Sequence, residues 1–341
     1  MNARTLMNGS RAAGDPMNDP RGRALGGMVR DQSVFGAVEV NEHIREDGRP
    51  TPQWRESLRR IPNFRNMLTV VMLYAQTLAI IYMAVHFNHW AIWVLAFVLM
   101  GRAHAQYSSL MHEAAHRSLF SNKTLNDFVG RWLLGFPVFV STDAYRRVHM
   151  AHHRQEFGPD EPDIPLYAGY PISPESFRRK MLRDATGQTG FTLLRGQLQA
   201  LRSPNKVIRN TMSKMIAVQV VLFAVSIALG HPFVYLLLWA LPWFTIWRVI
   251  NRLRAIAEHG GLRADPDRRN TTHSIRQHLV ARFFMVPYNI GFHIAHHVDA
   301  GVPFRSLPKL HRELVQAGFV TRGYEYPSYR SFWRAARTAN A

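Results

Sequence analysis

Four long apolar segments restrict this chain to folds built around helices that cross a membrane. They run from about Met67 to Phe87, from Trp90 towards Leu110, from about Met215 to Leu229 and from about Phe233 to Ile250. Each approaches the roughly 17–25 residues that an α-helix needs to cross a bilayer. A soluble all-α protein with buried helices is the alternative. Because the segments are long and pair around short loops, we expect an all-α integral membrane protein with a four-helix transmembrane bundle.

The loops between these segments indicate which side of the membrane each end faces. Residues 86–89 join the first two segments and residues 230–232 join the last two, and neither loop contains Lys or Arg. Basic residues gather at the opposite ends of the segments, among them Arg59, Arg65, Arg117, Lys123, Lys206, Lys214, Arg248 and Arg252. By the positive-inside rule, both termini and the large polar regions are expected in the cytosol. The chain is therefore predicted to be multi-pass, with a cytosolic helical cap.

Composition divides the chain into three parts. Residues 1–50 mix Gly, Arg, Asp, Asn and Pro, and they predict a mostly disordered cytosolic segment without a signal peptide. Residues 51–320 are the predicted membrane domain, and residues 321–341 are a predicted cytosolic tail. The net charge of +19 suggests an anionic partner. Since the basic residues follow the segment ends, we expect anionic lipid headgroups or an acidic electron carrier, and no nucleic acid.

Three histidine clusters form the candidate functional site. They are His112-Glu113-Ala114-Ala115-His116, His149-Met150-Ala151-His152-His153 and His293-Ile294-Ala295-His296-His297. Spacings of three and four place side chains on one face of a helix, and imidazole suits iron, copper and zinc. The His-x-x-His-His pattern occurs twice among 17 histidines in 341 residues, where about 0.04 occurrences are expected by chance. The clusters follow the second and fourth segments, so all three are expected at the cytosolic surface, where they can meet.

These clusters, their order and their place after apolar segments resemble the membrane fatty acid desaturase and hydroxylase superfamily. The resemblance covers about residues 65–315 and includes the acidic, proline-broken loop 159–163 and the stretch 296–304 followed by Leu307-Pro308. It implies a cytosolic cap that holds two non-haem irons. The implied ligands are the eight histidines of the clusters and a ninth between the last segment and the third cluster: His112, His116, His149, His152, His153, His259, His293, His296 and His297.

One departure from the family pattern concerns the second iron. Some acyl-chain desaturases have an asparagine four residues before the ninth histidine to hold an iron-bound water, and this chain has Ala255 there. Asn289 and Asn251 are possible substitutes. Outer carboxylates orient metal-bound imidazoles through their second nitrogen. The candidates are Glu113, Asp143, Asp160, Glu161, Asp163, Glu258 and Asp299, and we prefer Glu113, Asp163 and Glu258, together with Asn289, for this supporting layer.

The resemblance implies oxygen-dependent desaturation of an acyl chain, with no catalytic side chains beyond the metal ligands. Electrons are expected from an external carrier, such as a ferredoxin with its reductase, because the chain has no flavin fingerprint, no haem-binding His-Pro-Gly-Gly segment and no cysteine. A hydroxylase, ketolase or epoxidase of the same superfamily, acting on a lipid, a carotenoid or a specialised metabolite, stays open. So does a membrane zinc metalloprotease, because the first cluster spells His-Glu-x-x-His with Glu113 as general base. A protease would leave the other two clusters unexplained.

Overall fold

The chain folds into helices that form two compact units. The structure, a computed structural model, describes residues 22–158, 161 and 163–338, and within these residues no β-strand forms. The first unit contains residues 62–146 and 179–251, and we call it the apolar unit. The second contains the described residues of 9–61, 147–178 and 252–341, and we call it the histidine unit. The chain passes from one unit to the other within helices α5, α7 and α12.

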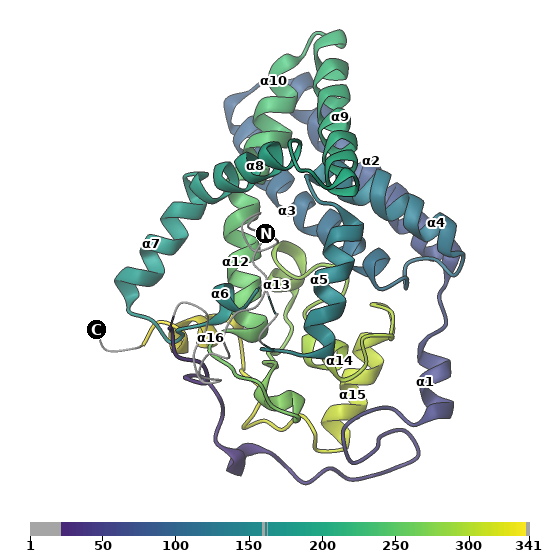
Figure 1. The fold of residues 1–341 in the computed structure, drawn as a ribbon, viewed down its shortest axis with the longest axis vertical. Coiled ribbons are helices and arrows are strands. Elements are labelled where there is room, and N and C mark those ends of the chain that lie inside the picture. Colours follow the sequence, from purple (N-terminus) through teal and green to yellow (C-terminus); the bar gives the residue numbers. More distant parts are fainter. Residues whose placement is uncertain (1–21, 159–160, 162, 339–341) are drawn as a thin grey trace. The chain divides into compact units, whose positions relative to one another are not determined.

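The apolar unit is built from long helices joined by tight turns (Figure 1). Asn88, in the left-handed conformation, ends α2 and lets α3 begin two residues later. Helix α2 packs against α3, and α9 packs against α10 and η5. The long elements are α2 (Asn63–Phe87), α3 (Trp90–Ala115), α9 (Lys206–Ala228) and the series α10 (Pro232–Val234), η5 (Tyr235–Ala240), α11 (Leu241–Phe244) and α12 (Ile246–His259). Shorter elements are α4 (Lys123–Phe128), η3 (Val129–Gly135), η4 (Phe136–Val138) and α8 (Gln188–Ala200).

Three helical stretches of the described chain, and not four, are long and apolar enough to cross a membrane. They are Asn63–Phe87, Lys206–Ala228 and Pro232–His259. The predicted span from Trp90 towards Leu110 is wrong by this measure, because the second half of α3 carries too many polar side chains. Arg102 bonds to Gln76 and Gln106 at 2.8 and 2.9 Å, and the ring of buried His104 lies 2.9 Å from the carbonyl of Trp239. The prediction relied on the length of this segment and therefore overestimated how apolar the helix is.

Short helices and loops make up most of the histidine unit. Its elements are η2 (Gln32–Val34), α1 (Pro52–Leu58), α6 (Ile164–Tyr167), η6 (Arg268–Asn270), α13 (Leu279–Phe284), α14 (His293–Val298), α15 (Leu307–Gln316) and α16 (Tyr329–Ala335), and it shares α5 (Thr142–Arg154), α7 (Pro174–Ala185) and α12 with the apolar unit. Helix α14 packs against α15 and η6. All six residues of α14 are buried, including three histidines.

Residues 22–50, predicted as mostly disordered, run along the histidine unit as a hydrogen-bonded segment. The amide of Met28 donates to the carbonyl of Gly261 at 2.8 Å, and that of Glu39 donates to Ala317 at 2.9 Å. Leu25, Met28 and Ile44 are buried. These apolar side chains are widely spaced, so they show no sustained period, although each is anchored in the unit. The rest of that predicted segment, residues 1–21, lies outside the described residues.

The region predicted as a C-terminal tail also belongs to the histidine unit as far as residue 338. Tyr326 forms a bridge with Ile275, and the indole of Trp333 donates to the carbonyl of Leu253 at 3.3 Å. Phe332 is fully buried in α16. The composition of this region is polar and basic, but its aromatic residues supply the packing that holds it in place.

Candidate metal centre

Three buried histidines from separate parts of the sequence converge in the histidine unit. His152 comes from the end of α5, His259 from the end of α12 and His297 from α14. One ligand nitrogen from each lies within 4.8 Å of the others, and all three side chains are buried. His152 and His297 belong to clusters whose histidines are spaced by three and four, which places their side chains on one face of a helix, whereas His259 stands alone at the end of α12.

The outer nitrogen of each ring is held by an acceptor. Nδ1 of His152 lies 2.5 Å from a carboxylate oxygen of Glu161, and Nδ1 of His297 lies 2.5 Å from one of Glu156. Nδ1 of His259 donates to the carbonyl of Thr271 at 2.8 Å. Each bond leaves Nε2 with its lone pair directed away from the acceptor. Nε2 of His297 is buried and has no hydrogen-bond partner among the described residues, as expected of a nitrogen that binds a metal.

A second set of ring nitrogens gathers beside this triad. Nε2 of His153 lies 3.1 Å from Nε2 of His149 and 3.1 Å from Nε2 of His296. Nε2 of His293 lies 2.9 Å from Nε2 of His259. Two nitrogens bound to one metal at about 2.1 Å lie about 3.0–3.4 Å apart, so these separations suit shared metal ions. The residues present therefore fit a metal centre with imidazole ligands.

Burial controls the protonation of these rings. It lowers the pKa of His293 and His297 well below the usual value, and the neighbouring histidines lower it further. Both rings are therefore neutral at pH 7, which is the state that binds a metal. Burial would also lower the pKa of His152, but the hydrogen bond and the charge of Glu161 raise it above the usual value. Glu161 thus makes His152 the most basic imidazole of the triad.

Glu156 was not among the residues predicted from the sequence. Its side chain is fully buried, and besides His297 it accepts hydrogen bonds from Arg268 at 2.7 Å and from the hydroxyl of Thr271. Burial raises the pKa of its carboxyl, and Arg268 and Thr271 oppose that rise. The available signal was its position, four residues after His152 and three after His153, where it continues the spacing of the cluster along α5 and the following turn.

An apolar wall closes the site on the side of His259. Leu25, Phe157, Tyr167 and Leu262 belong to one buried cluster, and the ring centroid of Tyr167 lies 5.0 Å from that of His259. The amide of Gly261 donates to the carbonyl of Tyr167 at 2.8 Å. Such a wall limits the access of water to the ligands and lowers the local dielectric constant.

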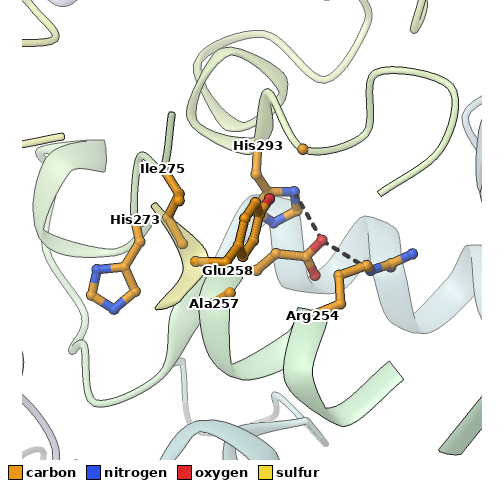
Figure 2. Close-up of a pocket in the computed structure, with 8 residues that line it drawn as sticks. Arg254, Ala257, Glu258, His273, Ile275 and His293 are labelled. Carbon is orange, nitrogen blue, oxygen red and sulfur yellow. Dashed lines mark ion pairs between the residues drawn. The ribbon is translucent and has the colours of Figure 1, made fainter. Parts of the chain in front are cut away.

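Glu258, one of the preferred supporting residues, lies beside His293 of the third cluster. Its carboxylate lies 3.6 Å from Nδ1 of His293 and 3.0 Å from Nε of Arg254, and a small pocket opens here that Tyr329 also lines (Figure 2). Figure 2 shows the three charged and polar groups in one row, with the carboxylate between the imidazole and the guanidinium.

The other predicted supporting residues lie in different surroundings. Asn289 accepts from Arg282 and donates to the carbonyl of Phe304, at 3.0 and 3.2 Å. Asp163 precedes α6 and contributes to the raised pKa of His152 only through its charge. Asp299 forms a two-point ion pair with Arg55. Asp143 pairs with Arg131 in the apolar unit at 2.8 Å. Asp160 lies outside the described residues.

The first histidine cluster ends helix α3 in the apolar unit. The ring centroids of His112 and His116 are 4.6 Å apart, and Nδ1 of His112 lies 3.5 Å from the carboxylate of Glu113. The hydroxyl of Ser118 donates to the other oxygen of Glu113 at 2.9 Å. The structure thus brings Glu113 to the outer side of His112.

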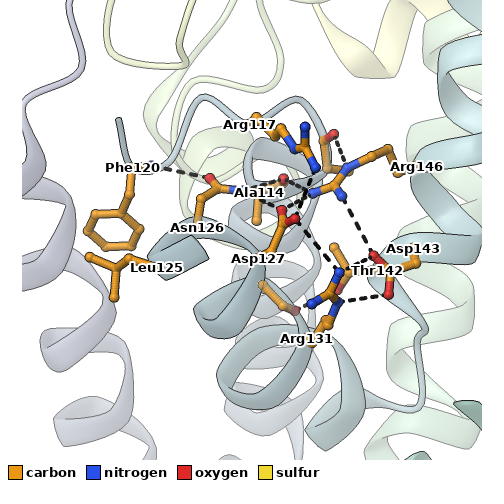
Figure 3. A network of polar contacts seen from close by, with 12 residues as sticks. Ala114, Arg117, Phe120, Leu125, Asn126, Asp127, Arg131, Thr142, Asp143 and Arg146 are labelled. Carbon is orange, nitrogen blue, oxygen red and sulfur yellow. Dashed lines mark hydrogen bonds and ion pairs between the residues drawn. The ribbon is translucent and has the colours of Figure 1, made fainter. Parts of the chain in front are cut away.

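An ion-pair network fixes the end of α3 that carries this cluster (Figure 3). Arg146, from α5, donates to the carbonyls of Ala114 and Ala115 at 2.8 Å and to Asp127 at 2.6 Å. Asp127 also accepts from Arg117 at 3.1 Å. The last carbonyls of a helix lack partners from the helix ladder, and here Arg146 bonds to two of them, that of Ala114 being shared with the side-chain amide of Asn126 at 2.8 Å.

Comparison with known proteins identifies the family. Residues 88–333 match the sequence model of the family described as fatty acid desaturase. The chain belongs to the fatty acid desaturase family. The matched region contains all three histidine clusters, His259 and Glu156.

Two relatives of this desaturase-family chain are themselves named as desaturases. One is the dihydrorhizobitoxine desaturase of Bradyrhizobium elkanii, 24% identical over an alignment of 243 residues that covers 67% of this chain and 69% of the relative. The other is an sn-1 acyl-lipid omega-3 desaturase (ferredoxin) of Nostoc sp. (strain 36), 25% identical over 144 residues. That match covers 42% of this chain and only 37% of the relative. Membership of the family places the chain among the oxidoreductases.

Proposed function

We propose that this chain is an oxygen-dependent desaturase of an acyl chain, with a histidine-ligated di-iron centre and an external electron donor. The observation that carries the proposal is the convergence of His152, His259 and His297, with every outer nitrogen held by an acceptor. Such partners on the second nitrogen fix the orientation of metal-binding imidazoles. The same three rings come from two histidine clusters and from the ninth predicted ligand.

The proposed ligand set has nine members. His152, His259, His293 and His297 would hold one iron, and His149, His153 and His296 would serve the second, which His112 and His116 complete by the family resemblance. Bound iron would supply the redox chemistry with oxygen that removes hydrogen from an unactivated carbon, which side chains alone cannot perform. The protein's own residues keep His293 and His297 neutral, orient the imidazoles through Glu156, Glu161 and the Thr271 carbonyl, and limit water on the side of Tyr167.

Desaturation is favoured over the other reactions of the superfamily by the names of the two relatives, and over zinc proteolysis by membership of the family. An acyl lipid is the proposed substrate class and a ferredoxin the proposed donor, as the name of the Nostoc relative suggests for that protein. The Bradyrhizobium relative is named for a different substrate, so a specialised metabolite is the second candidate.

We further propose that both termini and the metal centre lie in the cytosol. Residues 86–89 and 230–232 carry no Lys or Arg, whereas the opposite helix ends are basic.

The test is a mass profile of lipids and small metabolites from cells that express the intact chain with a ferredoxin and its reductase. Cells expressing His296→Ala are the control. We expect species lighter by two hydrogens only with the intact chain. Product species heavier by one oxygen would indicate that the chain catalyses hydroxylation or epoxidation and not desaturation. A purified protein that holds zinc and no iron would contradict the metal assignment.

A further inference from the structure

Helix α13 presents a concentrated apolar surface on the histidine unit. Leu279 is 81% exposed, Val280 64%, Phe283 45% and Phe284 41%. The described part of this unit has only two other large apolar side chains that are comparably exposed, Val40 and Val315. Scattered single residues of that kind are ordinary on any protein surface, but four within six residues mark an interaction site.

The helix is anchored firmly enough to present this surface. Ala281 and Met285 are buried on its opposite face, and the next residue, Val286, is also buried. The ring of His278 accepts a hydrogen bond from the amide of Ala281 at 3.4 Å and caps the first turn. The apolar side chains therefore point outwards because of how the helix is attached, and not because the helix is loose.

Basic and aromatic groups border the apolar surface. Arg282 is exposed and donates to Asn289, whose amide in turn donates to the carbonyl of Phe304. The exposed guanidinium of Arg305 lies 4.9 Å from the ring centroid of Phe304, and the half-buried ring of Tyr288 lies 6.0 Å from it. Asn289 thus links Arg282 of α13 to Phe304, and Arg305 and Tyr288 lie beside the ring of Phe304. We call Arg282, Arg305 and Tyr288 the rim of the apolar surface.

We propose that α13 inserts into the surface of an anionic bilayer and docks the histidine unit on the membrane. The candidate membrane span Pro232–His259 ends within the histidine unit, so a bilayer that held this span would bring the chain into this unit directly from the membrane. Phe, Leu and Val are suited to the boundary of the acyl chains, and tyrosine and arginine to the headgroups. The chain's net charge of +19 matches an anionic surface.

A protein partner fits this surface less well. The carriers expected to reduce the metal centre are acidic and bind through charge, whereas the centre of this surface is apolar and only its rim is basic. Ferredoxin docking is therefore the competing outcome of the test. Docking of α13 on the bilayer would hold α14 and its histidines near the membrane surface, because residues 285–292 connect α13 directly to α14.

Single-cysteine labelling tests the proposal cleanly, because the chain contains no cysteine. Val280→Cys and Phe283→Cys would each carry a nitroxide spin label in the full-length protein, reconstituted in nanodiscs of phosphatidylcholine and phosphatidylglycerol. Val40→Cys and Val315→Cys are the matched controls, since both are exposed apolar positions of the same unit. The readout is collision of the label with oxygen, which concentrates in the bilayer, against collision with a water-soluble nickel chelate.

We expect an oxygen-to-nickel ratio several-fold higher at Val280 and Phe283 than at the two control positions. Combining either label with Arg282→Glu and Arg305→Glu should lower the ratio in anionic nanodiscs and change it less in discs of phosphatidylcholine alone. Equal ratios at all four positions would overturn the proposal. Shielding of the α13 labels that arises only when ferredoxin is added would also overturn it, in favour of the protein partner. Iron content and size-exclusion profile confirm that each variant has folded.

Discussion

At the scale of single residues, the outer hydrogen-bond partners of the imidazoles determine what the site can bind. A histidine in solution exposes either nitrogen, but Glu156 and Glu161 each bond to Nδ1 and leave Nε2 for the metal. Carboxylates in this position also raise the basicity of the ring, which strengthens a bond to a metal cation. The two glutamates lie only five residues apart, so one short segment orients rings from two different clusters.

Glu156→Gln should weaken metal retention. The amide of glutamine keeps the size of the side chain but removes the negative charge. In the buried site that charge faces His297 and Arg268. We expect purified protein to lose iron roughly 10–100-fold faster to a chelator. Glu175→Gln, at an exposed acid of α7, is the matched control. Equal rates of iron loss in the two variants, with equal helix content by circular dichroism, would contradict the role given to Glu156.

His273 makes the stability of the protein depend on pH. Its Nε2 lies 2.8 Å from the carbonyl of Gly260, and burial lowers the pKa of its ring to about 4. An unfolded histidine, with a pKa of about 6.5, takes up a proton that the folded protein refuses. The free energy of unfolding therefore falls as the pH drops from about 6.5 towards 4, by up to about 3 kcal/mol from this group.

His273→Gln should remove part of this pH dependence, because the amide can still donate to Gly260 and does not titrate. Thermal unfolding of the metal-free protein in detergent, measured between pH 4 and pH 7.5, avoids competition between protons and metal. We expect the variant's unfolding temperature to fall less on acidification than that of the unaltered protein. Parallel curves for the two proteins would show that His273 does not carry the effect.

At the scale of elements, packing and end-capping decide where the histidine-bearing helices stop. Helix α3 ends at the first cluster, where Arg146 satisfies its last carbonyls, and Arg146 itself lies in α5, the helix that carries the second cluster. Gly101 allows a neighbour to come close to α3, because a Cβ there would lie 2.2 Å from the side chain of Ile246. Such contacts join residues that are far apart in the sequence.

Asp127→Asn should destabilise the apolar unit. Asp127 is largely buried and pairs with Arg117 and Arg146, so the change leaves two guanidinium groups without their acceptor's charge. We expect a loss of about 1–3 kcal/mol, seen as a lower unfolding temperature in detergent. Asp143→Asn is the matched control from the same network, because Asp143 is 34% exposed and its ion pairs are screened by water. A larger effect at Asp143 than at Asp127 would contradict this ranking.

At the scale of the whole molecule, the proposed metal centre should stabilise the two units unequally. Nearly all the predicted ligands lie in the histidine unit, whose helices are short, whereas the apolar unit is made of long helices. A metal that binds only the folded state stabilises the unit that supplies its ligands. Short helices also have little stability of their own and depend on tertiary contacts.

Removing the metal with a chelator should therefore loosen the histidine unit selectively. We expect faster amide hydrogen exchange in α14 and at the end of α5, with little change in α2 and α9. Adding iron back should restore the slow exchange. An equal increase in exchange across both units would instead mean that the metal supports the fold as a whole.

The sequence by itself predicted the family of this protein, which the comparison confirms, and proposed the imidazole ligands of its candidate metal centre. The spacing within the three clusters predicts aligned imidazoles, because helical geometry is local and repeats every few residues. The same locality explains why the predicted apolar segments from about Met67 to Phe87 and from about Met215 to Leu229 overlap the candidate spans Asn63–Phe87 and Lys206–Ala228.

Only the tertiary structure decided which residues surround those imidazoles. Glu156 and Thr271 are 115 residues apart and meet at His297 and His259, and no local pattern records such a contact. The polar side chains of α3 find partners on α2 and η5, which a hydropathy average cannot show. Residues 22–50 are held by carbonyls of distant loops. Hydrogen bonding and burial depend on the whole fold, whereas helix periodicity depends only on neighbours along the chain.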